Sequence, residues 1–246
     1  DLYKLRQTVK NAKSASDTFS YTDTILEKVD ELLVDARNKA ASMATDTVSE
    51  EARSAVAGEI QIMISQMLQL ANTQFAGRYV FAGHKVNTQP YQDNGIQIAY
   101  YGDEGEIAQR VELGGQTITV NVPGPRVFGS GTGQAGEGIF EVLKDLRDSL
   151  NNNNTDEIRN SLSSIDDEID KIANIRGEVG AKINRTQASM DELGIIELLL
   201  AGELSKIEEV DMALEAGKYV ANQEAYQAAL QATSSILKLP RLTDYL

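Results

Sequence analysis

The chain contains no cysteine, no tryptophan and a single histidine among its 246 residues. Without cysteine there is no disulfide bond, no catalytic thiol and no thiolate-ligated metal. One histidine also excludes every site that needs two imidazole ligands. These absences remove many classes of enzyme. The fold must therefore be held by apolar packing, for which a hydrophobic content of 41% is sufficient.

Positive charge is also scarce, because 23 Lys and Arg face 37 Asp and Glu and the net charge is −14 at pH 7. A chain this acidic lacks the basic surface that binds nucleic acids or anionic membranes, so we expect neither as a partner. Its apolar runs are far shorter than the roughly 20 residues of a membrane span. The start, Asp1-Leu2-Tyr3, does not resemble a signal peptide. Because it begins inside a helical pattern without Met, we expect the natural chain to start further upstream.

The first 44 residues carry a heptad pattern that predicts a long helix. Its apolar positions, seven residues apart, are Leu5, Ala12, Phe19, Leu26, Leu33 and Ala40. A second helix is predicted over about residues 50–76, closing at Gly77, with Thr47 and Glu50 as a capping box at its start. Because only about five residues separate the two helices, we expect them to pack antiparallel.

Between about residues 81 and 136 the composition changes to Gly, Pro, Tyr, Val and Thr. Alternating apolar and polar residues predict strands at 96–100 and 107–113, joined as a hairpin through the turn at 102–105. A further strand is predicted at 117–122, after Gly114-Gly115. This segment is therefore predicted to be a small antiparallel β module inserted between helices.

Helical patterning returns at Ile139, breaks at the asparagines 151–154, and then gives the strongest pattern in the chain. We define the heptad seam as Ile158, Ile165, Ile172, Val179, Thr186, Leu193, Leu200, Ile207 and Leu214. A companion stripe four residues further on holds Leu162, Ile169, Ile183, Met190 and Leu204, interrupted by Arg176 and Glu197. After Leu214 the apolar residues move to another face, which indicates a change of packing partner. We predict a long helical rod.

Motifs for chemistry are weak. Residues 131–136 match G-x-G-x-x-G, but no second strand follows the next helix, so a linker is favoured over a dinucleotide site. The acidic run at 166–170 is expected to be solvated, and the carboxylates near Asp103 lack calcium-loop spacing. His84 has no Ser or Cys partner nearby in the sequence. We therefore predict no catalytic, cofactor-binding or metal-binding residue, although a pair of carboxylates for glycoside hydrolysis stays open.

Apolar seams that run toward both ends of the chain need to be covered by copies of the chain or by neighbours in an assembly. We predict that an assembly or chaperone interface includes the following residues. They are Leu5, Phe19, Leu204, Ile207, Val210, Asp211, Leu214, Tyr219, Tyr226, Leu230 and Leu237.

Several segments resemble the flagellin superfamily, and most closely its hook-associated protein 3 family. The main one is Asn72-Thr73-Gln74-Phe75-Ala76-Gly77-Arg78-Tyr79-Val80-Phe81-Ala82-Gly83. Others are Tyr101-Gly102-Asp103, Asn121-Val122-Pro123-Gly124, Glu209-Val210-Asp211-Met212-Ala213 and the ending Leu242-Thr243-Asp244-Tyr245-Leu246. By this resemblance, a structural role falls to Asn72, Phe75, Gly77, Arg78, Phe81 and Gly83.

The resemblance implies a structural protein without enzymatic activity or cofactor. Members of this family form a ring at the hook–filament junction of the bacterial flagellum, between the preceding hook-associated protein and the first flagellin subunits. They are exported by the flagellar type III system, and an export chaperone binds their C-terminal helix. Expected partners are therefore sister subunits, these axial neighbours and the chaperone, and the expected location is secreted, at the junction.

The resulting prediction is a mainly α fold with an inserted β module (α+β), in which a flagellin-like, elongated long-helix rod domain carries a small antiparallel β domain. Residues 1–80 and 137–210 form the two parts of the rod, and residues 81–136 form the β domain. Residues 211–246 form a terminal inner-domain helix that lacks its N-terminal partner. The alternatives are a flagellin filament subunit, a non-flagellar coiled-coil signalling or adhesion module, and, remotely, a secreted carbohydrate-active or metal-dependent enzyme.

Overall fold

The computed structural model describes residues 2–95, 97–112, 117–131 and 138–237. The chain divides into two compact units, one over Tyr3–Leu193 and the other from Gly194 onward. Helix α5 (Thr155–Leu237) contributes to both. Helices dominate, and the strands form small antiparallel pairs, so the predicted α+β class is confirmed. The predicted four-part division into domains stays a prediction.

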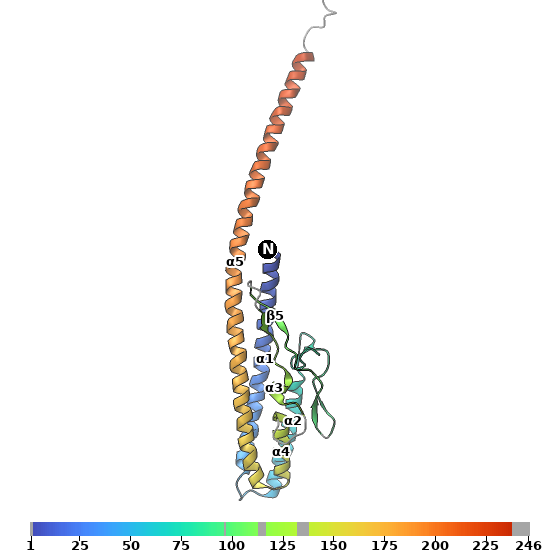
Figure 1. Cartoon of the computed structure of the whole chain (residues 1–246), viewed down its shortest axis with the longest axis vertical. Coiled ribbons are helices and arrows are strands. Elements are labelled where there is room, and N and C mark those ends of the chain that lie inside the picture. The colour runs from blue at the N-terminus through green and yellow to red at the C-terminus, as the bar shows by residue number, and fades with distance from the viewer. Residues whose placement is uncertain (1, 96, 113–116, 132–137, 238–246) are drawn as a thin grey trace, which may run out of the picture. The chain divides into compact units, whose positions relative to one another are not determined.

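The helical part of the first unit consists of α1 (Leu2–Met43), α2 (Glu50–Ala71), α4 (Ile139–Asn151) and the first part of α5 (Figure 1). Helix α2 packs against α4. Helices α1 and α5 are joined by ion pairs between Arg37 and Asp166 and between Arg176 and Asp23, the latter with 3.1 Å between nitrogen and oxygen. Arg176 interrupts an apolar stripe in the sequence, and the structure shows that it bridges two helices.

The predicted heptad positions form the core of this unit. Those of α1 are all at most 1% exposed, namely Leu5, Ala12, Phe19, Leu26, Leu33 and Ala40. The seam of α5 is buried in the same way from Ile158 to Leu193. Each apolar side chain of this size that leaves water contributes roughly 1.5–3 kcal/mol, so the two seams are a main source of stability.

The companion stripe on α5 lies elsewhere than predicted. The buried positions are three residues after the seam, at Ser161, Glu168, Ile175 and Ser189, whereas the positions four residues after it are half-buried. Polar side chains on this side are buried because each has a partner. Ser189 Oγ donates to the Val111 carbonyl of the β module at 2.5 Å, whereas Ser161 Oγ donates to the Glu157 carbonyl of the same helix and Glu168 pairs with Lys171.

Helix α2 also begins and ends differently from the prediction. Its N-cap is Ser49 rather than Thr47, and the Ser49 hydroxyl accepts a hydrogen bond from the Ala52 amide at 3.3 Å. It ends at Ala71 because the chain then forms a hairpin of β1 (Gln74–Phe75) and β2 (Arg78–Tyr79). The two residues of its turn, Ala76 and Gly77, have φ of 50° and 78°, as a two-residue hairpin turn with both central residues left-handed requires.

The strand pairing corrects the predicted hairpin between 96–100 and 107–113. Strand β4 (Ile98–Tyr100) pairs with the preceding β3 (Tyr91–Asp93), and β5 (Ala108–Arg110) pairs with β6 (Thr117–Thr119). The turn before β4 decides this. Asp93 Oδ1 accepts the Gly95 amide and Asn94 Oδ1 accepts the Gln97 amide, both at 2.9 Å. The predicted strand after Gly114-Gly115 is confirmed as β6, and residues 113–116 lie outside the described part.

An aromatic cluster joins the strands to the helices. Its rings come from Phe81, β3, β4, the short helix α3 (Gly124–Phe128) and α4, with neighbouring centroids 5.0–5.8 Å apart. The Tyr91 hydroxyl donates to the Gly129 carbonyl at 2.8 Å. Burial raises the pKa of Tyr91, and burial together with the Asp103 charge raises the pKa of Tyr100 to about 12.

Arg53 ties together the two turns at one end of the helical part. Its side chain is 3% exposed. It donates to the carbonyl oxygens of Met43 at 3.1 Å and Thr45 at 2.8 Å, and also to the side chain of Asn153. Asn153 has a φ of 54° and lies in the turn between α4 and α5. One guanidinium therefore holds the α1–α2 and α4–α5 connections together.

Replacing Arg53 by Met should lower the free energy of unfolding by about 3 kcal/mol, because the Met43 and Thr45 carbonyl oxygens and the Asn153 side chain lose their charged donor. Urea denaturation followed by circular dichroism measures the loss. Arg53→Lys should be intermediate, since an ammonium group cannot reach three acceptors in different directions. Wild-type stability of Arg53→Met would show that Arg53 does not hold these turns.

Candidate functional site

Many large apolar side chains are exposed along α5 after Gly194. Those of Ile195, Leu198, Leu199, Leu200, Leu204, Ile207, Met212, Leu214, Tyr219, Val220, Tyr226 and Leu230 are between 38% and 76% exposed. Exposed large apolar side chains in this number mark interaction sites. We call residues 195–230 of α5 the apolar segment.

The predicted interface residues divide into three groups. Exposed within the apolar segment are Leu204, Ile207, Leu214, Tyr219, Tyr226 and Leu230. The side chains of Val210, Asp211 and Leu237 lie outside the described part of the structure. Leu5 and Phe19, by contrast, are buried within the first unit, and the Lys182 ammonium lies 5.7 Å from the Phe19 ring centroid. These two residues belong to the core, so we leave them out of the candidate surface.

The apolar segment changes face along its length, as its sequence predicts. Leu200, Ile207 and Leu214 recur at intervals of seven, and so do Met212, Tyr219 and Tyr226 on another face. Charged side chains pair along the helix between these stripes, with Lys206 Nζ 3.0 Å from Glu203 and Lys218 Nζ 2.7 Å from Glu215. Such pairs support an exposed helix by a few tenths of a kcal/mol each but cover little apolar surface.

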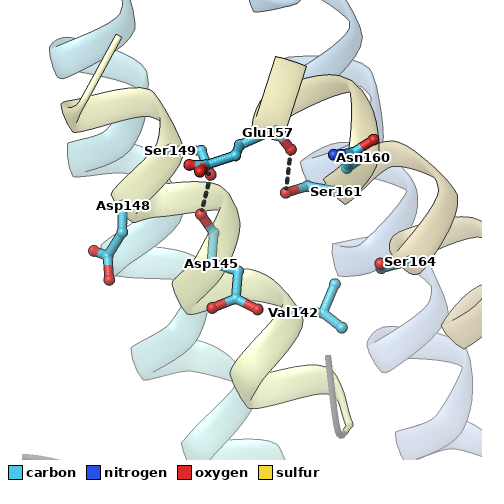
Figure 2. Close-up of a pocket in the computed structure, with 8 residues that line it drawn as sticks. All are labelled: Val142, Asp145, Asp148, Ser149, Glu157, Asn160, Ser161 and Ser164. Atoms are coloured by element: carbon cyan, nitrogen blue, oxygen red, sulfur yellow. Dashed lines mark hydrogen bonds between the residues drawn. The ribbon is translucent and has the colours of Figure 1, made fainter. Parts of the chain in front are cut away.

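One pocket of about 340 Å³ lies between α4 and α5 (Figure 2). Its lining includes the carboxylates of Asp145, Asp148 and Glu157. Ser149 Oγ donates to the Asp145 carbonyl at 2.6 Å, and Ser161 Oγ donates to the Glu157 carbonyl at 3.0 Å. Ser149 Oγ also lies 3.5 Å from a carboxylate oxygen of Glu157, but its single hydrogen has the shorter bond to the Asp145 carbonyl, so this pair does not indicate an activated nucleophile.

Other candidates for chemistry have structural partners. Asp103 accepts hydrogen bonds from the His84 and Gly105 amides, which lower the pKa of its carboxyl group. His84 Nε2 lies 3.1 Å from the Glu106 carbonyl oxygen. In the acidic run, Glu168 pairs with Lys171 at 2.9 Å. Residues 132–136 of the glycine motif lie outside the described part.

Within the described ranges, no cluster of three or more His, Cys, Asp or Glu could bind a metal ion. The helices of these ranges also include none with the length and apolarity of a bilayer crossing.

Two residues of the family motif connect the end of α2 to its surroundings. Both ends of the Asn72 amide bind the backbone of Tyr91: Nδ2 donates to the carbonyl at 2.8 Å, and Oδ1 accepts the amide hydrogen at 2.9 Å. Phe75 packs against Tyr21 of α1, with 4.9 Å between ring centroids. The motif therefore anchors β3 to α2 and the β1–β2 hairpin to α1.

The other motif residues shape the chain that follows. Phe81 is buried against Phe128, and its carbonyl accepts the Tyr100 hydroxyl at 3.0 Å. Gly77 and Gly83 have φ of 78° and 66°. Arg78 is exposed in β2. A structural role for Asn72, Phe75, Gly77 and Phe81 agrees with these contacts.

Lys182 is a structural residue that the sequence pattern does not single out. It occupies the side of α5 that faces β6, where its ammonium donates to the Thr119 carbonyl at 3.2 Å. Burial lowers its pKa. Only its position three residues after Val179 of the seam could have indicated this contact.

Substitution by alanine should have different effects at the two glycines of the motif, Gly77 and Gly83. A Cβ at Gly83 would overlap the backbone carbonyl oxygen of Asp103, whereas a Cβ at Gly77 has no atom within 4 Å. Gly77→Ala should therefore cost only the left-handed strain, about 1 kcal/mol, and Gly83→Ala about 3 kcal/mol in unfolding free energy. Chemical denaturation of both variants tests this, and equal losses would contradict the predicted clash.

Two flagellin family models match this chain. The bacterial flagellin N-terminal helical region matches residues 1–86, and the bacterial flagellin C-terminal helical region matches residues 162–246. Together they cover more than two thirds of the chain.

Individual relatives support the same family assignment. Flagellar hook-associated protein 3 of Escherichia coli (strain K12) is 26% identical over 239 residues, which are 89% of this chain and 74% of that protein. The fold is similar to FlgL of Xanthomonas campestris, with a TM-score of 0.75 and 15% identity over 83% of this chain and 98% of that one. Flagellar hook-associated protein 3 of Legionella pneumophila also gives a TM-score of 0.75, at 18% identity over 85% and 97% of the two chains. With both terminal flagellin regions and relatives of this kind along most of its length, the chain belongs to the flagellin superfamily, in its hook-associated protein 3 family.

Proposed function

We propose that this chain is a structural subunit of the bacterial flagellum and acts at the junction between hook and filament. The observation that carries this proposal is the similarity to hook-associated protein 3 along 89% of the chain. The exposed apolar segment supports it, because a subunit of a polymer needs surface that its neighbours cover. A structural rather than an enzymatic role is the one that this similarity supports best.

Assembly by packing of the terminal helix is the mechanism that we propose. In the free chain, large side chains of the apolar segment contact water, and burying each of them contributes roughly 1.5–3 kcal/mol. Association orders and stabilises such a helix by mass action. A closed ring forms if each subunit contacts the next through the same pair of surfaces and the repeated rotation returns to the first subunit.

The proposed partners are sister subunits in this ring, the preceding hook-associated protein on one side and flagellin on the other. We further propose that the chain leaves the cell through flagellar type III export and that an export chaperone covers the apolar segment before secretion. A chain without cysteine suits this route, because no disulfide bond has to be opened for threading.

Deleting the gene from its source bacterium tests the proposal. Electron microscopy should show intact hooks without filaments, and flagellin should accumulate in the medium because nothing attaches it. Complementation with the intact gene should restore filaments. Normal filaments after deletion would refute the junction role and favour a non-flagellar coiled-coil function, and a loss of flagellin itself would identify the chain as the filament subunit.

Polar substitution in the apolar segment should separate assembly from folding. Tyr219→Gln combined with Tyr226→Gln should abolish filament attachment in complemented cells, while the unfolding free energy stays within about 0.5 kcal/mol because both side chains are more than 60% exposed. The matched control is Tyr101→Gln, an exposed tyrosine of the first unit, which should retain motility. Wild-type motility of the double variant would rule out this face as an assembly surface.

A further inference from the structure

A groove of about 530 Å³ is lined by the β1–β2 hairpin, by β5 and by Ser14 and Thr18 of α1. Its volume lies in the range of roughly 300–1,000 Å³ that is typical of ligand sites. Among the described residues that line the groove, only Arg78 carries a charge. The apolar part of the lining consists mainly of Phe75, Val80, Val86, Ile107 and Val120. In a chain with a net charge of −14, an anionic group entering this groove therefore meets a cation and no carboxylate.

The Arg78 guanidinium has no ion pair or hydrogen bond within the described ranges. Arginines that connect the β module to α5 are paired, in contrast. Arg126 Nη2 lies 2.9 Å from Glu178, and Arg185 Nη2 lies 2.8 Å from Glu112. Because a guanidinium can bind a carboxylate through two parallel hydrogen bonds, Arg78 suits a carboxylate that another molecule supplies.

The edge of β5 away from β6 has free backbone groups in the same groove. The Ile107 carbonyl accepts the Val120 amide at 2.8 Å, and hydrogen-bonded pairs alternate along an antiparallel ladder, so the N–H and C=O of Ala108 point away from β6. The next outward-facing carbonyl, that of Arg110, accepts Asn11 Nδ2 of α1 at 3.3 Å. Neither backbone group of Ala108 has a partner in the described part of the chain. An added strand would use both of them.

The hairpin on the other side of the groove uses its own amides. The Tyr79 amide donates to the Val86 carbonyl at 2.8 Å, and the Val80 amide donates to the Thr73 carbonyl at 3.1 Å. An incoming chain therefore pairs with β5. A small anion could accept from Arg78 but would leave a backbone carbonyl without a donor, whereas an extended peptide supplies a donor, an acceptor and alternate side chains for the apolar lining.

We infer that this groove binds an extended segment of another protein, which pairs with β5 at Ala108 and places a carboxylate against Arg78. A second copy of this chain does not supply such a segment, because its described strands contain one carboxylate, Asp93, and Asp93 Oδ1 already accepts the Gly95 amide at 2.9 Å. The inference goes beyond the proposed function and does not rest on it, because the groove consists of residues of the first unit alone. It gives the exposed arginine of the family motif a binding role.

An NMR titration of the full chain tests this inference with a defined probe, the acetylated and amidated peptide Thr-Val-Glu-Val-Thr. The amide signal of Ala108 should shift in a saturable manner, because its N–H gains a hydrogen bond. The matched probe Thr-Val-Gln-Val-Thr has the same shape without the charge. It should bind about tenfold more weakly, because its amide forms a weaker hydrogen bond with Arg78 than a carboxylate does.

Three variants separate the two contacts. Arg78→Gln should weaken binding of the glutamate peptide about tenfold and change binding of the glutamine peptide little. Ala108→Pro removes an N–H that lies outside the β5–β6 ladder, so it should abolish binding of both peptides while the fold is retained. Lys28→Gln removes an exposed cation of α1 that does not line the groove, and this control should bind as the wild type does.

The inference would be overturned if millimolar glutamate peptide produced no saturable shift at Ala108. Equal affinity for the two peptides would overturn it too, as would unchanged affinity of Arg78→Gln for the glutamate peptide. Sodium acetate that produces the same shifts would identify a site for a small anion instead. Self-association of the wild type in sedimentation velocity that both Arg78→Gln and Ala108→Pro abolish would identify a second copy as the occupant. None of these results bears on the junction role, which the gene deletion tests.

Discussion

Burial of the heptad seam of α5 is the interaction on which the rest of the structure depends. From Ile158 to Leu193 the seam is covered within the first unit, where the heptad positions of α1 are equally buried. From Leu200 onward the same pattern is exposed. One continuous helix therefore contains a stretch that the first unit covers and a stretch that is exposed among the described residues, and the second stretch is the basis of the proposed assembly.

Polar contacts give this apolar packing its specific geometry. Arg176 and Arg37 bridge α1 and α5 at the solvent edge of the seam, and Arg53 holds two turns at one end. Because surface ion pairs contribute little stability, the bridges between helices matter more for register than for energy. The buried Arg53 contributes to both. Asn72 and Lys182 extend the same principle to the β strands, because each uses a side chain to satisfy strand backbone groups.

This organisation agrees with a subunit that must fold alone and then assemble. The core formed by α1, α2, α4 and the first part of α5 buries the heptad positions of the first unit within the chain itself. In the proposed assembly the apolar segment gains its packing on association, so its stability would depend on subunit concentration.

The sequence by itself determined the helices, the core positions on their seams and the exposed apolar residues beyond Leu193, because a heptad repeat encodes both helix and buried face in local spacing. It also contained the family motif. Tertiary structure decided which strands pair, since Asp93 and Asn94 stabilise the earlier turn, and it decided that the second buried stripe of α5 falls at Ser161 and Ser189. It also decided that Leu5 and Phe19, heptad positions of α1, are covered within the first unit rather than by another molecule. These outcomes depend on which neighbour lies against each side chain, and local spacing carries no information about neighbours distant in sequence.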